Sequence, residues 1–278
     1  MNFMPCIDAG EPVLEATVAQ ARDVWGERLV AAYALGSLAH GGFSIHVSDA
    51  DVALVLRDPL QPDDASGADR LLSLVKEANT PLADRLSLFW GSPETLAGRT
   101  SGGRFPPADR QDLKDFGRLL AGRDLRSQLV RPSLNELIAD GAELALEKLS
   151  HLAVIAKLKE PRALAACGAT KLTKWLLFPV RLIFTARTGN VGGVDLAVEH
   201  FCGTTGGPAA ELARAALGWR HAPPEAHDQQ VIALIERGLL PLYTRFFDEY
   251  EPRLRIIERA DLAEAFRHWR HRMKECDS

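Results

Sequence analysis

Two aspartates near the start of the chain have the residue type and the spacing that bind a metal ion. Asp49 and Asp51 are separated by one residue and open an apolar run, Val52–Leu56. Alternate side chains of a β-strand face the same side, so the two carboxylates can converge on one cation. Mg²⁺ takes one or two carboxylates together with waters and substrate phosphates, and a metal pair steadies both oxygens of a phosphoryl transfer. Asp49 and Asp51 are therefore predicted to be catalytic residues that hold two Mg²⁺ ions.

A glycine–serine pair precedes the aspartates, with eleven residues between Ser37 and Asp49. Gly36 ends an apolar run, and a glycine there lets backbone amides approach a phosphate closely. Ser37 can add its hydroxyl to the same phosphate oxygens, and Ser48 can fix the turn or a carboxylate by hydrogen bonding. The simpler interpretation is a strand-turn-strand unit with two exposed aspartates in its loop.

The surrounding sequence predicts the elements that position these residues. Apolar runs over residues 29–35, 52–56 and 86–90 indicate strands, and helical spacing marks residues 12–26 and 67–79. Residues 91–109 are rich in Gly, Pro, Ser and Arg and are predicted to be a loop. From about Ser133, which has a capping-box spacing to Glu136, only helices follow. The fold class is thus α+β, with an N-terminal domain over residues 1–128 and an α-helical domain over residues 129–278.

The stretch GSLAHGGFSIHVSDADVALVL resembles the signature of the DNA polymerase β-type nucleotidyltransferases: G-S, a spacer, S-D-x-D and an apolar strand. The resemblance implies a small mixed sheet flanked by helices. It also implies that Asp49 and Asp51 bind Mg²⁺, while Gly36 and Ser37 bind the triphosphate of a nucleotide co-substrate.

The third carboxylate of that family is usually on the next core strand, where it completes the metal site or acts as general base. In this sequence the equivalent strand, Leu86–Trp90, has Ser87 in its interior. Asp84, just upstream, is the first candidate for the catalytic base, and Glu94, just downstream, is the second. If neither reaches the site, nucleotide binding survives while catalysis becomes doubtful.

The second half of the chain also resembles a family. Residues 174–201, KWLLFPVRLIFTARTGNVGGVDLAVEHF, are similar to the helical domain of the aminoglycoside adenylyltransferases that modify streptomycin and spectinomycin. Arg181 matches the arginine that reaches the triphosphate in that family, and a guanidinium suits this task. Val194 stands where the family has a phosphate-binding lysine. The resemblance implies that the helical domain closes the active-site cleft.

These observations predict a Mg²⁺-dependent transfer of a nucleoside monophosphate, AMP from ATP, to a hydroxyl acceptor such as an aminoglycoside-like small molecule. Two alternatives stay open. One is a nucleotide-binding or protein-interaction module with impaired catalysis, and the other is a protein-modifying nucleotidyltransferase of toxin–antitoxin type.

The composition and charge of the chain indicate its class of protein and limit the kinds of partner that it can bind. A content of 46% hydrophobic and 25% charged residues argues against a disordered or fibrous chain. The net charge of −4 and the pI of about 6.1 disfavour nucleic acid as a partner. Cys6, Cys167, Cys202 and Cys276 form no C-x-x-C pair, the N-terminus has no export signal, and no apolar run is long enough for a membrane. A cytoplasmic protein is expected.

Three further expectations concern surface and linker residues. His40 and His46, which flank the nucleotide motif, are expected at the surface. Residues 109–126 are expected to dock the helical domain. His268 and His271 share a helix face with several basic residues, and a solvated basic face is the favoured interpretation.

Overall fold

The computed structural model describes residues 9–275, and the chain divides into two compact units, one ending at Pro132 and the other beginning at Ser133. The N-terminal residues up to Asp8, where no export signal is expected, lie outside the described residues, and so do Cys6 and Cys276. Each unit has its own hydrophobic core. The predicted α+β class is confirmed, because all strands of the described chain belong to the first unit and the second is helical.

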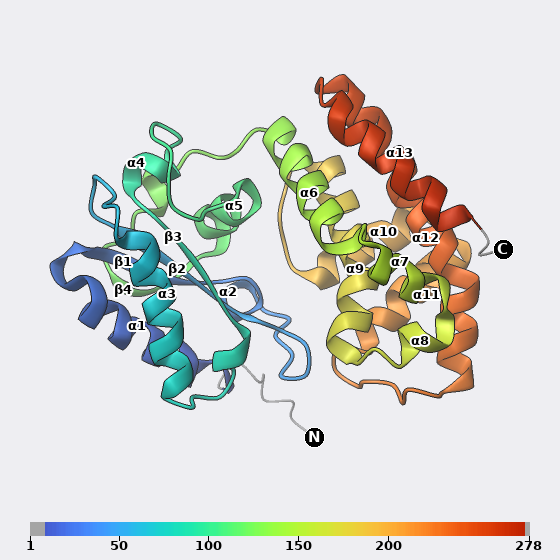
Figure 1. Ribbon diagram of the computed structural model, residues 1–278, viewed down its shortest axis with the longest axis horizontal. Coiled ribbons are helices and arrows are strands. Elements are labelled where there is room, and N and C mark those ends of the chain that lie inside the picture. The colour runs from blue at the N-terminus through green and yellow to red at the C-terminus, as the bar shows by residue number, and fades with distance from the viewer. Residues whose placement is uncertain (1–8, 276–278) are drawn as a thin grey trace. The chain divides into compact units, whose positions relative to one another are not determined.

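The N-terminal unit is built on one four-stranded mixed sheet with the order β3-β2-β1-β4 (Figure 1). Its strands are β1 (Leu29–Leu35), β2 (Ala50–Leu56), β3 (Leu86–Gly91) and β4 (Arg118–Gly122). β1 is antiparallel to both β2 and β4, whereas β3 runs parallel to β2. A parallel pair needs a crossover connection, which α3 supplies between β2 and β3.

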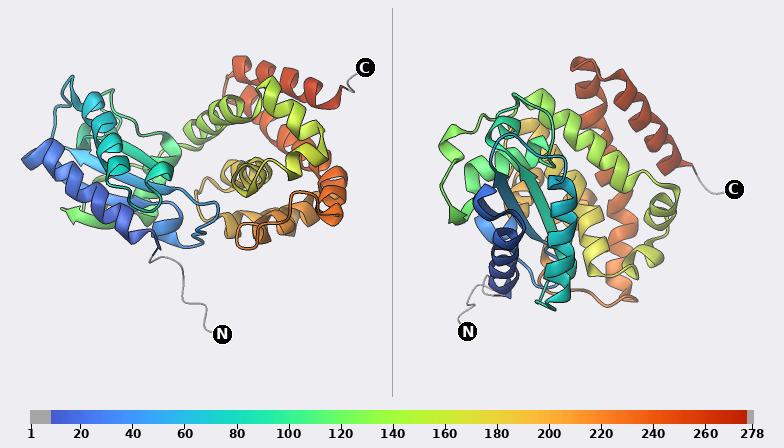
Figure 2. Two further views of the ribbon diagram at one scale, coloured as in Figure 1. Left: turned by 60° about the horizontal axis from the view of Figure 1, so that its bottom comes forward. Right: turned by 60° about the vertical axis from the view of Figure 1, so that its left-hand side comes forward.

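Helices cover both faces of this sheet (Figure 2). The helices of the unit are α1 (Glu11–Trp25), α2 (Ser37–His40), α3 (Asp64–Glu77), α4 (Pro93–Leu96) and α5 (Pro107–Phe116). α1 and α3 pack against one face, where Val52 and Leu54 of β2 point. Alternate residues of β2, Ala53 and Val55, point to the opposite face and pack against Leu113 of α5. Residues of β2 with odd numbers therefore face α5.

Asp64, the first residue of α3, links this helix to α1 and the turn after it by hydrogen bonds. Its buried carboxylate accepts hydrogen bonds from Trp25 Nε1 (3.0 Å) and from two nitrogens of Arg28 (2.6 and 2.8 Å). Burial alone raises the pKa of Asp64, but the hydrogen bonds from Arg28, the Gln61 amide and Trp25 outweigh it and lower the pKa below its ordinary value. The carboxylate is thus ionised and fixes the orientation of α1 on α3.

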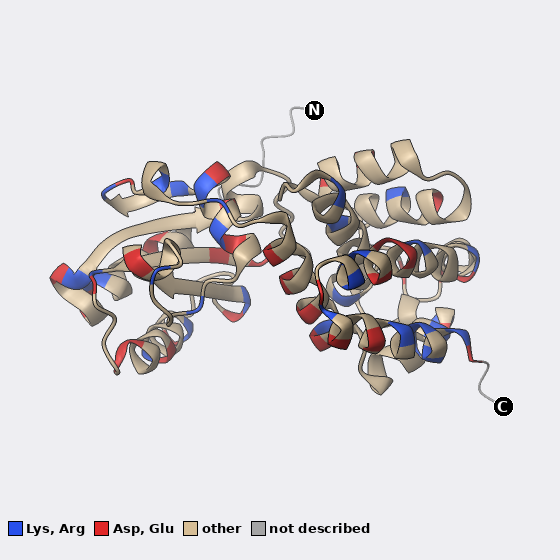
Figure 3. Cartoon of the chain, turned by 90° about the horizontal axis from the view of Figure 1, so that it is seen from above, with Lys and Arg blue, Asp and Glu red and all other residues tan. Residues whose placement is uncertain are grey.

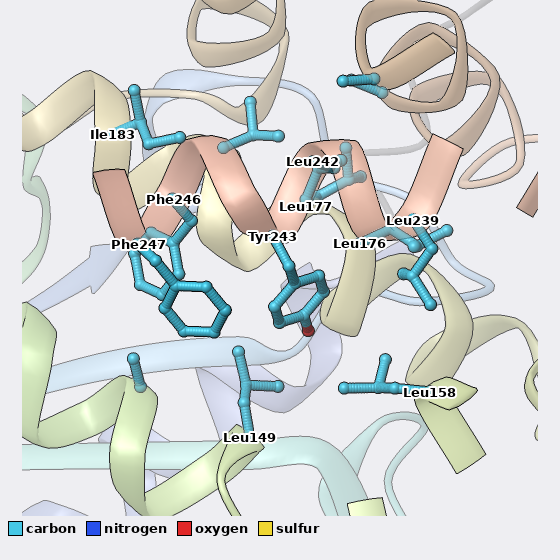
Figure 4. Packing of buried hydrophobic residues seen from close by; sticks show 14 of the residues in the cluster. Leu149, Leu158, Leu176, Leu177, Ile183, Leu239, Leu242, Tyr243, Phe246 and Phe247 are labelled. Atoms are coloured by element: carbon cyan, nitrogen blue, oxygen red, sulfur yellow. The ribbon is translucent and has the colours of Figure 1, made fainter. Parts of the chain in front are cut away.

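The C-terminal unit contains α6 (Leu134–Leu149), α7 (Leu152–Lys159), α8 (Pro161–Ala165), α9 (Ala169–Thr188), α10 (Val194–Thr204), α11 (Gly207–Gly218), α12 (Gln229–Ile256) and α13 (Ala260–Lys274). α12 contributes buried aromatic residues to the centre of the unit, among them Tyr243, Phe246 and Phe247 (Figure 4). None of the helices in residues 9–275 combines the length and the apolar character needed to cross a membrane.

The capping box predicted at Ser133 is present. Ser133 Oγ accepts the Glu136 amide (3.2 Å), and Glu136 Oε2 accepts the Ser133 amide (2.8 Å). The helix that begins there, α6, ends at Leu149, and α7 follows after a break. At the break, the hydroxyl of Ser150 donates to the carbonyl of Leu146 (2.7 Å), a local bond of the kind that competes with helix continuation.

The prediction of a loop over residues 91–109 is wrong in two places. The segment contains the short helix α4, whose Ser92 and Thr95 form a second capping box, and it includes the first turn of α5. Pro107 occupies the first turn of α5, where the missing N–H of proline costs nothing. The sequence does not predict β4 either, because this edge strand is only partly buried and shows no clear alternation.

Candidate active site

The turn between β1 and α2 brings the backbone of Gly36 against the side chain of Asp51. Gly36 has φ +57° and ψ −143°, a conformation that residues with a Cβ rarely adopt. A Cβ built on Gly36 would lie 2.6 Å from Oδ2 of Asp51, so only a glycine leaves room for this carboxylate. Leu35 pairs with Asp51 across β1 and β2, which puts the contact at the end of the ladder. The predicted turn and the predicted acid therefore lie side by side.

Asp51, the second residue of β2, points to the side of the sheet that faces α5, and Asp49 directly precedes the strand. Both are partly exposed. Within residues 9–275, no group of three or more His, Cys, Asp or Glu side chains is placed to hold a metal ion. The two carboxylates fit Mg²⁺, because this ion commonly takes only one or two protein carboxylates and completes its shell with water and phosphate oxygens.

Ser48 closes the turn that leads into this strand. Its side chain is buried, and its Oγ accepts the backbone amide of Ser44 at 2.9 Å. The Ser48 amide in turn donates to the Ser44 carbonyl, also at 2.9 Å. Ser48 therefore fixes the turn that precedes Asp49 by hydrogen bonding.

The position next to Asp51 on β3 belongs to Ser87. The two residues are register partners in the parallel pair, so their side chains point to the same face of the sheet. The strand that was expected to supply a third carboxylate thus presents a hydroxyl beside Asp51.

The two candidates for the third acid lie on either side of this position. Asp84 is exposed, in the 3-10 turn Ala83–Arg85 that precedes β3. Glu94 follows the other end of the strand, in α4, and forms an ion pair with Arg99 (2.6 Å). Since Gly91 pairs with Val55 and Ser87 with Asp51, Glu94 is beyond the end of β3 that is remote from the aspartates. Asp84 is at the nearer end and stays the predicted base.

A further acid, Asp112, contacts the glycine turn and was not singled out by its sequence. Its Oδ2 accepts the Gly36 N–H at 2.7 Å, and its Oδ1 lies 3.5 Å from Nε2 of His40. The ring of Phe116, one turn further along α5, packs edge-on against the His40 ring with 5.4 Å between centroids. The surface position expected for His40 is wrong, since only 10% of its side chain is exposed. His46 is exposed, as expected.

Arg181 lies on α9 of the helical unit, with an exposed side chain. It is close enough to Arg220 to affect its titration. Burial lowers the pKa of Arg220, the positive charge of Arg181 lowers it further, and Asp195 raises it. The helical unit therefore holds two guanidinium groups and one carboxylate near one another.

Several basic residues near the C-terminus have acidic partners. Figure 3 shows many basic residues on α13, of which Arg270 pairs with Asp248 (2.7 Å), while Arg259, just before the helix, pairs with Asp261 (2.8 Å). His268 and His271 each lie beside a glutamate, at 2.7 and 3.0 Å, and both are exposed. The favoured interpretation of a solvated face is confirmed for them.

Replacing Ser87 by glutamate is expected to add a carboxylate to the aspartate pair. Without metal, the like charges of Glu and Asp51 on neighbouring strands should lower the free energy of unfolding by up to about 1 kcal/mol. Added Mg²⁺ should reverse this loss and stabilise the variant at lower concentrations than the unaltered protein. Thermal unfolding over a Mg²⁺ titration measures both effects, and Ser73→Glu, on the exposed face of α3, is the control. A variant that responds to Mg²⁺ like Ser73→Glu would contradict the placement of Ser87.

The chain is similar to known proteins at the level of structure. No family model matches its sequence, and no curated protein does. Among solved structures, the chain is similar to spectinomycin adenyltransferase AAD(9) from Enterococcus faecialis, solved with ATP and spectinomycin, with a TM-score of 0.61 and 15% sequence identity. The match covers 84% of this chain and 98% of that one. The chain therefore has the α+β nucleotidyltransferase fold of that adenylyltransferase, which confirms at the level of the fold the resemblance predicted from the sequence.

Proposed function

We propose that the chain is a Mg²⁺-dependent nucleotidyltransferase that transfers AMP from ATP to a hydroxyl acceptor and releases pyrophosphate. The observation that carries the proposal is the contact of Gly36 with Asp51. Gly36 has a backbone conformation that other residues rarely adopt, and it packs against the carboxylate of Asp51 at the start of β2. Such a turn offers a backbone approach for phosphate beside a pair of metal ligands.

Asp49 and Asp51 would hold the ions, and Ser37 would bind the triphosphate from the turn that Gly36 forms. When bound, Mg²⁺ neutralises charge on the triphosphate and steadies the attacking and leaving oxygens. Arg181 is the predicted second contact to the phosphates, since its guanidinium offers a charge and several planar donors. In the reaction, the acceptor oxygen forms a bond to the α-phosphorus as the bond to the bridging oxygen of pyrophosphate breaks. Asp84 is the predicted acceptor of the hydroxyl proton.

The acceptor is proposed to be an aminoglycoside-like small molecule. The protein of similar fold was solved with spectinomycin, and the net charge of −4 favours a cationic acceptor over a nucleic acid. The fold and the charge both support this class of acceptor. We also propose that the protein acts in the cytoplasm.

One observation favours a second function, a nucleotide-binding module without turnover. Ser87 occupies the strand position beside Asp51 at which a carboxylate would lie close to the ions. If Asp84 does not reach the acceptor, the chain keeps its nucleotide site and lacks a base. The two functions differ in product formation, because only the transferase releases pyrophosphate in the presence of an acceptor.

The test is calorimetric titration of ATP with and without Mg²⁺, on the unaltered protein and on Asp49→Asn and Asp51→Asn. We expect Mg²⁺ to tighten ATP binding in the unaltered protein and both variants to lose this gain. Asp69→Asn, an exposed acid on α3, is the matched control and should bind like the unaltered protein.

Absence of binding by ATP and by the other nucleoside triphosphates would overturn the proposal, as would equal binding by all variants. Where binding needs Mg²⁺ and the aspartates, pyrophosphate release with spectinomycin or streptomycin then separates the transferase from the binding module.

A further inference from the structure

Asp112 occupies the point where the nucleotide turn meets α5. Its carboxylate accepts the N–H of Gly36 at 2.7 Å, a short distance for a charge-assisted hydrogen bond. The two residues are 76 positions apart in the chain, so this is a tertiary contact and not part of the turn itself. Gly36 therefore lies between two carboxylates: that of Asp112 accepts its amide, and that of Asp51 lies 2.6 Å from the position that a Cβ would take.

The surroundings of Asp112 fix its carboxylate in place. The neighbouring Leu113 is 1% exposed and belongs to the core under the sheet, which anchors α5 at this turn. Only 13% of the Asp112 side chain is exposed, and its second oxygen faces Nε2 of His40 at 3.5 Å. The Phe116 ring covers the same histidine. Asp112 therefore approaches Gly36 from an anchored helix, with its remaining oxygen directed at a residue of α2.

Gly36 needs such an anchor because of its place in the sheet. The residue follows Leu35, the last strand residue, so its N–H lies beyond the β1 ladder. Glycine also has the largest conformational freedom of any residue, and its left-handed conformation is one of several it can adopt. A carboxylate that accepts the Gly36 N–H selects one orientation of the peptide plane, and that plane determines where Ser37 and the following turn of α2 point.

We propose that Asp112 is a positioning residue of the nucleotide site, which orients the Gly36 peptide so that Ser37 and Asp51 face the bound triphosphate. The inference rests on the proposed function. It also assigns the Gly36 N–H to Asp112, so the phosphate contacts of the turn come from Ser37, and the contribution of Gly36 is its conformation.

Three substitutions at one position distinguish positioning from simple charge. Asp112→Asn keeps an oxygen that can accept the Gly36 N–H but removes the charge. Asp112→Glu keeps the charge but moves the carboxylate by one methylene, and Asp112→Ala removes both. Asp115→Asn is the control, because Asp115 is on the same helix and pairs with Arg131 (2.8 Å) instead.

The measurements are the dissociation constant of Mg²⁺–ATP by calorimetry, the unfolding midpoint, and the amide resonance of Gly36 in isotope-labelled protein. The Asp112→Ala and Asp112→Glu variants should bind about tenfold more weakly, whereas Asp112→Asn should stay within about threefold of the unaltered protein. The Gly36 amide should shift strongly upfield in Asp112→Ala, because it loses its charged acceptor. Asp115→Asn should leave both the affinity and the Gly36 resonance unchanged.

Any other pattern of affinities among these variants would overturn the proposal that Asp112 positions the turn. Tighter binding by Asp112→Ala would mean that Asp112 competes with phosphate for the Gly36 amide. If Asp112→Glu kept its affinity for Mg²⁺–ATP while Asp112→Asn lost it, the charge of the side chain would matter and the position of its oxygen would not. If Asp112→Ala fails to fold, the comparison of Asn with Glu still decides between these roles. Lack of Mg²⁺–ATP binding by the unaltered protein would overturn the proposed function as well, whereas binding unaffected by any substitution would overturn this inference alone.

Discussion

Replacing Gly36 by alanine is expected to weaken Mg²⁺-dependent nucleotide binding by about 100-fold, the same scale as the loss of rate when a catalytic group is misplaced by about 1 Å. The new methyl group would lie 2.6 Å from Oδ2 of Asp51, a distance that real Cβ contacts do not show. Relief requires either the turn or the carboxylate to move, and both belong to the proposed site. Alanine also disfavours φ +57°, which adds strain to the displacement.

A matched control separates these two causes. Gly41 ends α2 with φ +94°, and a Cβ there would meet no atom within 4 Å. Gly41→Ala therefore introduces backbone strain without displacing Asp51. Calorimetry on the two variants should find a large loss for Gly36→Ala and a much smaller one for Gly41→Ala. Equal losses would mean that strain in the turn, and not the position of Asp51, controls the affinity.

Replacing Phe246 by alanine is expected to lower the free energy of unfolding of the helical unit by about 3–5 kcal/mol, as for other buried aromatic residues truncated in a core. Phe246 is fully buried on α12. Its ring lies 4.8 Å from that of Tyr250 and 5.4 Å from that of Phe266, measured between centroids. Figure 4 shows Phe246 beside Phe247 in this cluster. Truncation leaves a cavity that the helices around it can fill only partly.

Urea denaturation followed by circular dichroism measures this loss, and hydrogen exchange of the α12 amides assigns it to the helical unit. Ile256→Ala is the control on the same helix, because Ile256 is 78% exposed, and its loss should stay within about 0.5 kcal/mol. A shift for Phe246→Ala as small as that for Ile256→Ala would show that the aromatic cluster is not the centre of this core.

The nucleotide motif was predictable because its parts are close in sequence. The strand before Gly36, the turn and the strand after Asp51 fall within about thirty residues, and the periodicity of each strand is local. The start of β2 differs slightly from the prediction, because the strand begins at Ala50 and so includes Asp51. The assignment of Asp51 to the end of the ladder, in contact with Gly36, required the pairing register that only the structure gives.

Asp112 could not be found in the same way. It is one of several acids in the polar sequence of α5, and nothing in its spacing separates it from Asp109 or Asp115. Only the packing of Leu113 into the core turns Asp112 toward the glycine turn. Residues 109–126 supply most of α5 and the edge strand β4 to the N-terminal unit, and their docking of the helical domain stays a prediction.

The bond between Gly36 and Asp112 also bears on the order in which this protein assembles during synthesis. Its two ends are 76 residues apart, so the bond closes only after all the strands of the β1–β3 part of the sheet have left the ribosome. A nascent chain can pair β1 with β2 much earlier, since these strands are near neighbours in sequence. The turn at Gly36 can therefore form early in synthesis, whereas its hydrogen bond to Asp112 forms late. A nascent chain that ends before α5 contains both aspartates but lacks the carboxylate that accepts the Gly36 amide.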